Sequence, residues 1–257
     1  EERELGLSIL LALFVLAVVV AGHRASSLLW EWEQRDGAEP PGPLERTSAT
    51  VVMAIAVAIS VDWTLALLHL FTVTGLTVAS VLLLAVSLLS SRQALVRSVK
   101  EAFSADLKFG VNATLFTVAA LVPVLAWIIY VAWRGAVCFV SDHDGLGYHM
   151  PKALLVVRAH GYGYFDGSMR AIPTFPMNHE LLLANVIALT GADEITEWVS
   201  AAMFLALGLV AGGAIERWWG SKLAALTVML LTWAMPVALL HSASHKNDLL
   251  FATCTVA

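Results

Sequence analysis

The chain has 257 residues, of which 59% are hydrophobic and 14% are charged. Soluble domains usually carry about a quarter charged residues. This composition therefore argues against a soluble domain and favours an all-α, polytopic transmembrane protein surrounded by membrane lipid. The net charge of −5 offers no basic surface, which excludes nucleic acid as an expected partner. Cys138 and Cys254 have neither a paired nor a metal-binding spacing, so they predict no disulfide framework and no zinc site.

The first half of the sequence is expected to cross the membrane several times. Residues 5–21 form an apolar run that is just long enough to span the bilayer. A polar segment follows over residues 23–46 and ends in the helix-breaking sequence Pro-Pro-Gly-Pro. Residues 47–90 are largely apolar and too long for one span, so we divide them into two helices with a turn near residues 71–75.

Two titratable residues, Asp62 and His69, lie inside this long apolar run. An acid within the membrane is a candidate for function because the desolvation of its charge is costly. Asp62 stands beside Trp63, however, and this pair is equally typical of a membrane interface. The sequence alone leaves both interpretations open.

The orientation is predicted from residues 91–108, a short loop with a net basic charge. It holds four cations and two acids: Arg92, Arg97, Lys100 and Lys108 against Glu101 and Asp106. Loops rich in Lys and Arg stay in the cytoplasm, so the span over residues 109–133 should run outward. Residues 1–108 then form N-terminal transmembrane helices and a cytoplasmic loop. Residues 109–257 form a transmembrane core with an external loop over residues 134–177.

The rest of the core is predicted to contain one short helix and two further spans. Residues 178–190 are too few for a span, so this helix is re-entrant or interfacial, with Asn178 as its cap and Glu180 as an acid in its first turn. An inward span, a cytoplasmic turn, an outward span with a kink at Pro236 and a second external loop follow, over residues 198–215, 216–222, 223–240 and 241–248. The last residues begin another span, so we expect the chain to be part of a longer protein.

The external stretch from residue 141 to residue 180 concentrates titratable groups at the end of an apolar span. It opens with Asp142, His143 and Asp144. Pro151 is suited to the first position of a short helix, and Gly161 is a stop signal for it. A catalytic or binding site is therefore expected in this loop.

The sequence Asp-Gly-Leu-Gly-Tyr-His-Met-Pro that begins at Asp144 resembles a pattern of the bacterial GT-C membrane glycosyltransferases. These are polytopic relatives of protein mannosyltransferases and aminoarabinose transferases. The resemblance continues through the Pro-Met-Asn-His-Glu-Leu-Leu sequence that begins at Pro176, the Gly191-Ala-Asp193 region, Pro236 and Lys246-Asn-Asp248, and it covers about residues 132–257. The family pattern commonly has a Trp before the first acid, whereas His143 stands here.

The resemblance implies a GT-C-like fold and transfer of a sugar from a polyprenyl-phosphate-type lipid to an acceptor. It makes Asp144 the leading catalytic residue, and it places Asp248 in a second loop near the catalytic centre. It also implies an integral protein of the bacterial inner membrane with an extracytoplasmic active site. The sugar, the acceptor and the oligomeric state are not predicted.

The proposed chemistry requires such residues for independent reasons. An attacking hydroxyl must lose a proton, for which a carboxylate is a natural base. The leaving phosphate gains negative charge, which a cation stabilises. No cofactor is certain, and a divalent metal is a possible addition because Asp and His are competent ligands. The residues assigned to substrate binding are Asp142, Tyr148, His149, Lys152, Arg158, Lys246 and Asn247.

Simpler interpretations compete with each assignment. The two acids and the His at the loop entrance are also typical of a solvated loop, and Tyr148 and His149 of packing against the membrane. Lys152 and Arg158 are interpreted more readily as membrane-interface anchors that extend to water. Glu180 is expected to be a helix-terminus acid rather than a catalyst, and Asn247-Asp248 can cap a helix.

Two other classes of protein are alternatives to the transferase. A transporter or flippase of lipid-linked or small polar substrates would line its pathway with Asp62 and His69. A noncatalytic membrane scaffold would need neither residue. Charge is concentrated in the loops rather than in facing spans, which favours chemistry at the membrane surface.

Overall fold

The computed structural model describes residues 2–35, 37, 39–90, 111–137, 144–162 and 177–257. In this part of the chain all regular structure is helical, which confirms the predicted all-α class. The elements are α1 (Glu2–Arg35), α2 (Pro43–Leu67), α3 (Val73–Ser90), α5 (Val111–Val137), the π-helical turn η1 (Gly145–His149), α6 (Met150–Ala159), α8 (Asn178–Thr190), the 3₁₀ turn η2 (Glu194–Thr196), α9 (Glu197–Trp219), α10 (Lys222–Ala234), α11 (Pro236–Ser242) and α12 (Asp248–Val256).

Three of these helical segments are long and apolar enough to cross a membrane: Ser8–Glu33, Pro43–Leu67 and Glu194–Trp219. Helices α10 and α11 together form a fourth candidate that is bent by 63°. The bend falls at Pro236, where the sequence predicted a kink, because proline lacks the N–H that would continue the helix. These lengths and compositions are compatible with an integral membrane protein.

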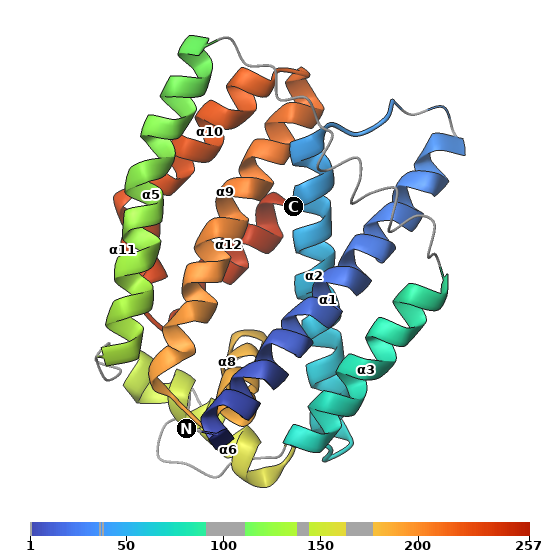
Figure 1. Cartoon of the computed structure of the whole chain (residues 1–257), viewed down its shortest axis with the longest axis vertical. Coiled ribbons are helices and arrows are strands. Elements are labelled where there is room, and N and C mark those ends of the chain that lie inside the picture. The colour runs from blue at the N-terminus through green and yellow to red at the C-terminus, as the bar shows by residue number, and fades with distance from the viewer. Residues whose placement is uncertain (1, 36, 38, 91–110, 138–143, 163–176) are drawn as a thin grey trace.

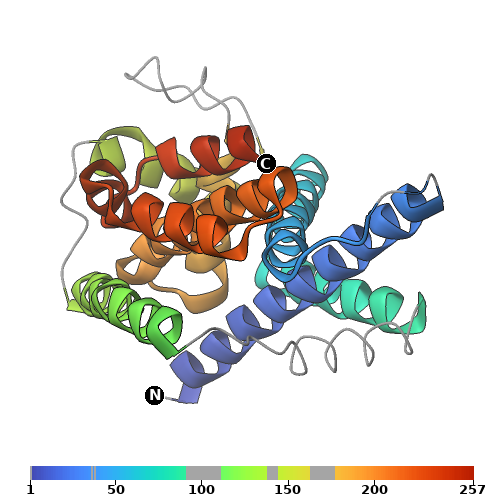
Figure 2. The same ribbon diagram turned by 90° about the horizontal axis from the view of Figure 1, so that it is seen from above.

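The long helices lie roughly side by side, and the short helices α6 and α8 gather at one end of them (Figure 1). Seen from above, α1 crosses the bundle obliquely beside α2 and α3 (Figure 2). Residues buried in α1, α2, α6 and α8 form one apolar core, with Leu181 and Leu183 at zero exposure. A second core lies between α9 and the helices that follow it, and includes Phe204 and Trp233.

The division of residues 47–90 into two helices is confirmed. Helix α2 ends at Leu67 and α3 begins at Val73, so the turn lies slightly before the predicted position. The turn is fastened to the end of α6, because Phe71 donates its N–H to the carbonyl of His160. The predicted helix before Gly161 is present as α6, although His160 rather than the glycine takes the left-handed conformation, with φ at 54°.

One sequence-based boundary and one predicted cap are wrong. The polar segment over residues 23–46 was expected to be separate from the first span, but α1 continues without a break to Arg35. Helix α8 has the predicted bounds, yet its N-cap is Met177, and no side chain caps it. The amide oxygen of Asn178 instead accepts a hydrogen bond from Trp63 Nε1 at 2.8 Å.

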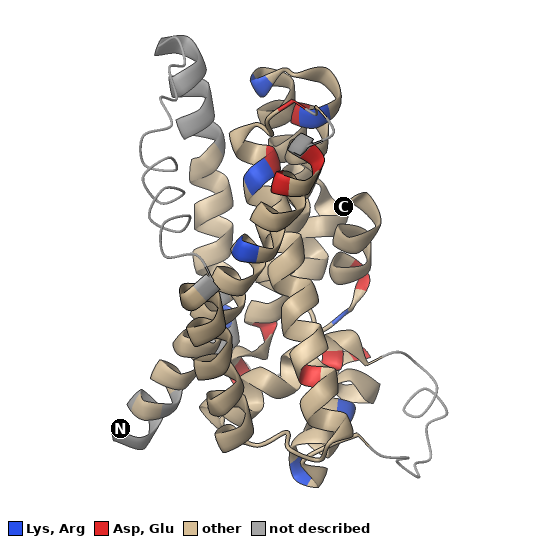
Figure 3. Cartoon of the chain, turned by 90° about the vertical axis from the view of Figure 1, so that its right-hand side faces the viewer, with Lys and Arg blue, Asp and Glu red and all other residues tan. Residues whose placement is uncertain are grey.

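Charged residues gather mainly toward the two ends of the bundle (Figure 3). At the end away from α6 and α8, Arg217 of α9 lies 3.4 Å from Glu45 of α2 and 3.7 Å from Glu33 of α1. Glu216 accepts the N–H of Glu45 at 2.9 Å. These contacts join α1, α2 and α9 at the turn that was predicted to be cytoplasmic. The loop over residues 91–108, on which that orientation depends, lies outside the described residues.

Candidate functional site

The predicted catalytic acid and a predicted substrate-binding cation meet at the α6 and α8 end. Asp144 immediately precedes η1, and Lys246 lies in the loop between α11 and α12. Lys246 Nζ is 3.1 Å from Asp144 Oδ2, and the two side chains are 37% and 34% exposed. The structure thus joins the two loops that the sequence predicted to be external. We call this pair the Asp144–Lys246 junction.

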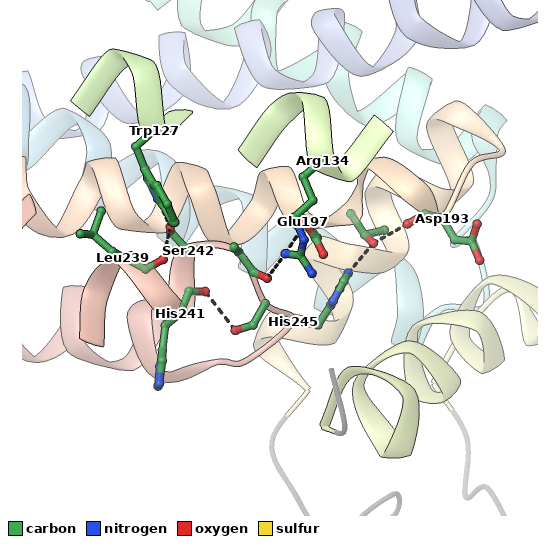
Figure 4. Close-up of polar contacts among 11 residues, drawn as sticks. Trp127, Arg134, Asp193, Glu197, Leu239, His241, Ser242 and His245 are labelled. Carbon is green, nitrogen blue, oxygen red and sulfur yellow. Dashed lines mark hydrogen bonds and ion pairs between the residues drawn. The ribbon is translucent and has the colours of Figure 1, made fainter. Parts of the chain in front are cut away.

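The loop that carries Lys246 is held by contacts to α5 and to the 3₁₀ turn η2 (Figure 4). Arg134, in the last turn of α5, forms an ion pair with the buried Glu197 at 3.2 Å and donates to the carbonyl of Ala243. His245 is fully buried, and its Nε2 lies 2.8 Å from Thr196 Oγ1. Thr196 gives its single hydroxyl hydrogen to the carbonyl of Asp193, so His245 is the donor in this contact.

Asp248, the second predicted catalytic residue, contacts a histidine of the same loop. His241 Nδ1 is 3.0 Å from Asp248 Oδ2, and the Asp248 side chain is 57% exposed. Asn247 is the N-cap of α12, but its side chain makes no capping hydrogen bond, so the side-chain cap considered from the sequence is absent. His241 was not singled out from the sequence. Its position seven residues before Asp248 is the only signal that the sequence offers.

A tight turn connects Asp144 to the buried side of the site. The five residues of η1 form a π-helical turn, in which Met150 donates its N–H to the carbonyl of Gly145. Such turns are rare and occur frequently at functional sites. Tyr148 is half-buried, and its ring lies over that of His149 at a centroid distance of 4.0 Å.

Behind this turn lies a buried charged cluster that the sequence analysis missed. Glu180 Oε1 accepts a hydrogen bond from His149 Nδ1 at 3.1 Å and lies 3.6 Å from Lys152 Nζ. Glu180, His149 and Lys152 have no exposed surface, and His179 is only 2% exposed. The four residues are called the Glu180 cluster below. The expectation that Lys152 extends to water at the membrane interface is wrong.

Burial and mutual contacts shift the pKa values of three residues in the Glu180 cluster. Burial alone would raise the pKa of Glu180, but the hydrogen bond from His149 and the charge of Lys152 hold it below its ordinary value. Burial lowers the pKa of Lys152, and Glu180 opposes that change. Burial, followed by the nearby His149, lowers the pKa of His179 to about 3, so this ring is neutral at pH 7.

Several buried atoms of the Glu180 cluster have no hydrogen-bond partner among the described residues. They are Glu180 Oε2, His149 Nε2 and both ring nitrogens of His179. Buried polar atoms are usually paired with protein or ordered water. Even so, within the described residues no group of three or more His, Cys, Asp or Glu side chains has a metal-binding arrangement. Asp142 and His143 lie outside the described residues, so the divalent metal stays a prediction.

The Glu180 cluster and the Asp144–Lys246 junction belong to one region. Thr196 Oγ1 lies 3.7 Å from the sulfur of Met150, the residue after His149, and it also holds His245, the residue before Lys246. Arg158 stands apart at the exposed end of α6, and no side-chain partner is recorded for it among the described residues.

Asp62 and His69, the two residues considered for a transport pathway, lie in different environments. Asp62 has zero exposure, and both its oxygens accept from Asn185 Nδ2, at 2.7 and 2.6 Å. His69 is exposed in the turn after α2. Asp62 therefore links α2 to α8, and it does not form a common polar lining with His69.

Comparisons with protein-family models, with curated proteins and with solved structures find no match to this chain. Any function of this chain must therefore be inferred from its own residues and their geometry.

Proposed function

We propose that the chain is a membrane glycosyltransferase of the GT-C type. It transfers a sugar from a polyprenyl-phosphate-type lipid to an acceptor hydroxyl, at the extracytoplasmic end of its helices. The single observation that supports this proposal most strongly is the Asp144–Lys246 junction. It places a carboxylate and an ammonium group, each partly open to solvent, where two loops meet at the end of a helical bundle.

The two groups are suited to the two charge changes of such a reaction. The acceptor oxygen forms a bond to the anomeric carbon while the bond from that carbon to the phosphate oxygen breaks. Asp144 takes the hydroxyl proton as general base. The lipid phosphate leaves with the bonding electrons, and Lys246 stabilises its negative charge. A donor phosphate would compete with Asp144 for Lys246 and so leave the carboxylate available to the acceptor.

The location of the junction favours a lipid-linked donor. Apolar helices lead to it, and Trp133 and Leu240, near the ends of α5 and α11, are 59% and 70% exposed. A polyprenyl chain in the bilayer can lie along such apolar surface while its phosphate reaches a cation at the helix ends. In this proposal Tyr148 and Asn247 contact the substrate. Asp248 supports the site indirectly through its contact with His241.

The alternative of a transporter has weaker support. Its two candidate residues lie in different environments, and both oxygens of the buried Asp62 accept hydrogen bonds from Asn185. A scaffold would not need the partly exposed ion pair between two loops. We therefore retain the transferase as the proposed function.

The test is sugar transfer by the purified protein from a panel of radiolabelled polyprenyl-phosphate sugars. Asp144→Asn keeps the size of the side chain and removes the base, so turnover should fall by about 10²–10⁴-fold. Lys246→Gln should raise the KM for the donor. Asp193→Asn is the matched control, because Asp193 is exposed at the same end and is placed in no catalytic role. Equal rates for Asp144→Asn and the control would remove Asp144 from the mechanism.

A further inference from the structure

We propose that Glu180 is a positioning residue that sets the place of Asp144 opposite Lys246, acting through His149 and the π-helical turn η1. This inference rests on the proposed function, in which Asp144 is the base. Glu180 does not touch the substrate, because it has no exposed surface.

The turn η1 is the link between Asp144 and His149. Asp144 precedes η1 and His149 ends it, so the turn determines the distance and direction between the two residues. Gly145 and Gly147 lie between them, and glycine permits many backbone conformations. A π-helical turn with two glycines does not hold one geometry by its own preferences. Contacts from outside the turn must select it.

Glu180 supplies such a contact at the far end of the turn. It accepts from His149 at 3.1 Å and pairs with Lys152, one helical turn further on in α6. One carboxylate thus fixes the last residue of η1 and the first turn of α6 together. Its charge is compensated inside the protein, which makes the arrangement specific to an acid at this position.

Glu180 is itself held by a rigid support. Helix α8 is fastened to α2 at two points, by Trp63 to Asn178 at 2.8 Å and by Asn185 to both oxygens of Asp62. A continuous series of contacts therefore runs from the transmembrane helix α2 through α8 and Glu180 to Asp144. The cluster is not arranged as a phosphate site, because Glu180 already neutralises Lys152.

The kinetic test is a double-mutant cycle on the full chain. A misplacement of about 1 Å can cost about 10²-fold in rate, so Glu180→Gln should lower kcat by about that factor, with the donor KM changed by less than about twofold. In an Asp144→Asn background the same substitution should cause no further loss, because its effect passes through Asp144. Comparable losses in both backgrounds would overturn the proposal and indicate general damage to the fold.

Three further variants keep the test informative if Glu180→Gln folds poorly. His149→Asn retains a donor near the position of Nδ1 and should keep most of the rate, whereas His149→Phe should reproduce the loss. Glu194→Gln is the matched control, since Glu194 is an acid of the neighbouring turn η2 and has no part in the Glu180 cluster or the Asp144–Lys246 junction. Equal rates for His149→Asn and His149→Phe would contradict the proposed path through the His149 hydrogen bond.

A cross-linking test separates this inference from the proposed function. Cysteines replace Asp144 and Lys246 in a background without the native cysteines, and a short bis-maleimide reports how often the two positions meet. The cross-link should form quickly when Glu180 is present and at least about tenfold more slowly with Glu180→Gln. Equal rates would overturn the positioning role even if the protein transfers sugars. A clear difference would support it even if no sugar donor is accepted.

Discussion

Replacement of Gly22 by alanine should weaken the packing of α1 on α2. A Cβ atom on Gly22 would clash with the backbone nitrogen of Ala54 and would lie 2.6 Å from its Cα. Carbon atoms prefer separations of about 3.5–4.0 Å, so the two helices would have to move apart by about 1 Å. The obstacle is backbone rather than a flexible side chain, and small residues are what allow membrane helices to approach this closely.

The magnitude follows from a comparison with Gly6, which lies in the same helix and would place its Cβ more than 4 Å from every neighbour. Both substitutions gain the greater helix propensity of alanine, about 1 kcal/mol at most. This gain cancels in the difference between the variants, which leaves the overpacking cost of about 1–3 kcal/mol. We expect Gly22→Ala to be the less stable variant by that amount.

The assay is tryptophan fluorescence of the purified protein in mixed micelles, with the mole fraction of a denaturing detergent raised stepwise. Gly6→Ala should unfold at or slightly above the wild-type midpoint, and Gly22→Ala clearly below it. If Gly22→Ala unfolds at the same midpoint as Gly6→Ala, the close approach of α1 and α2 is refuted.

Four shorter predictions concern orientation, pH, the second loop and metal. Single cysteines at Asp193 and Ser221, in a background without other cysteines, should react with an impermeant thiol reagent from opposite sides of the membrane; labelling from the same side would exclude the predicted orientation. Burial, followed by His149, lowers the pKa of His179 to about 3. In the unfolded chain this histidine binds a proton below about pH 6.5, whereas in the folded chain it stays neutral down to about pH 3. Its contribution to stability is therefore complete above that range and should fall by about 2 kcal/mol at pH 5, and His179→Gln should lose this part of the pH dependence in denaturation curves. Asp248→Asn should reduce sugar transfer strongly at unchanged protein abundance, whereas full activity would limit Asp248 to a structural role at the start of α12. Addition of a chelator should lower the rate if a divalent ion takes part, and an unchanged rate would remove it from the mechanism.

Helix bounds were predicted correctly where specific residues mark the start or the end of a helix. The bounds of α8 agree with those predicted from Asn178 as a cap, although no side chain caps the helix, and Gly191 in the left-handed conformation ends it. The end of α1 was not predicted correctly, because hydropathy indicates where a helix leaves an apolar environment rather than where its hydrogen bonds stop. Residues such as Leu, Glu, Gln and Arg continue a helix readily after the apolar run has ended.

The exposed pair of the candidate site was predicted from the sequence, whereas the pairing of Glu180 with His149 and Lys152 was not. Asp144 and Lys246 belong to loops that were predicted to be external from a recognisable pattern of residues, and the structure brings the two side chains together. Glu180 was interpreted as a first-turn acid, which describes its place in α8 but not its partners. Its contacts to His149 and Lys152 span 31 and 28 residues of sequence, and one sequence carries no signal for such a pairing. The adjacent His179-Glu180 pair within an apolar segment was the available hint.

The length of α8 has a consequence for how the protein is assembled in the membrane. Its 13 residues extend about 20 Å, whereas the hydrocarbon core of a bilayer is about 30 Å thick. The helix also contains His179, Glu180 and Asn185, and the transfer of their polar atoms into lipid is energetically unfavourable. It therefore cannot be inserted as an independent unit during synthesis. The N-terminal helices must already be in place to offer it Asp62 and Trp63. Biogenesis should accordingly proceed in two stages, in which α1 to α3 are inserted first and α8 packs against them afterwards.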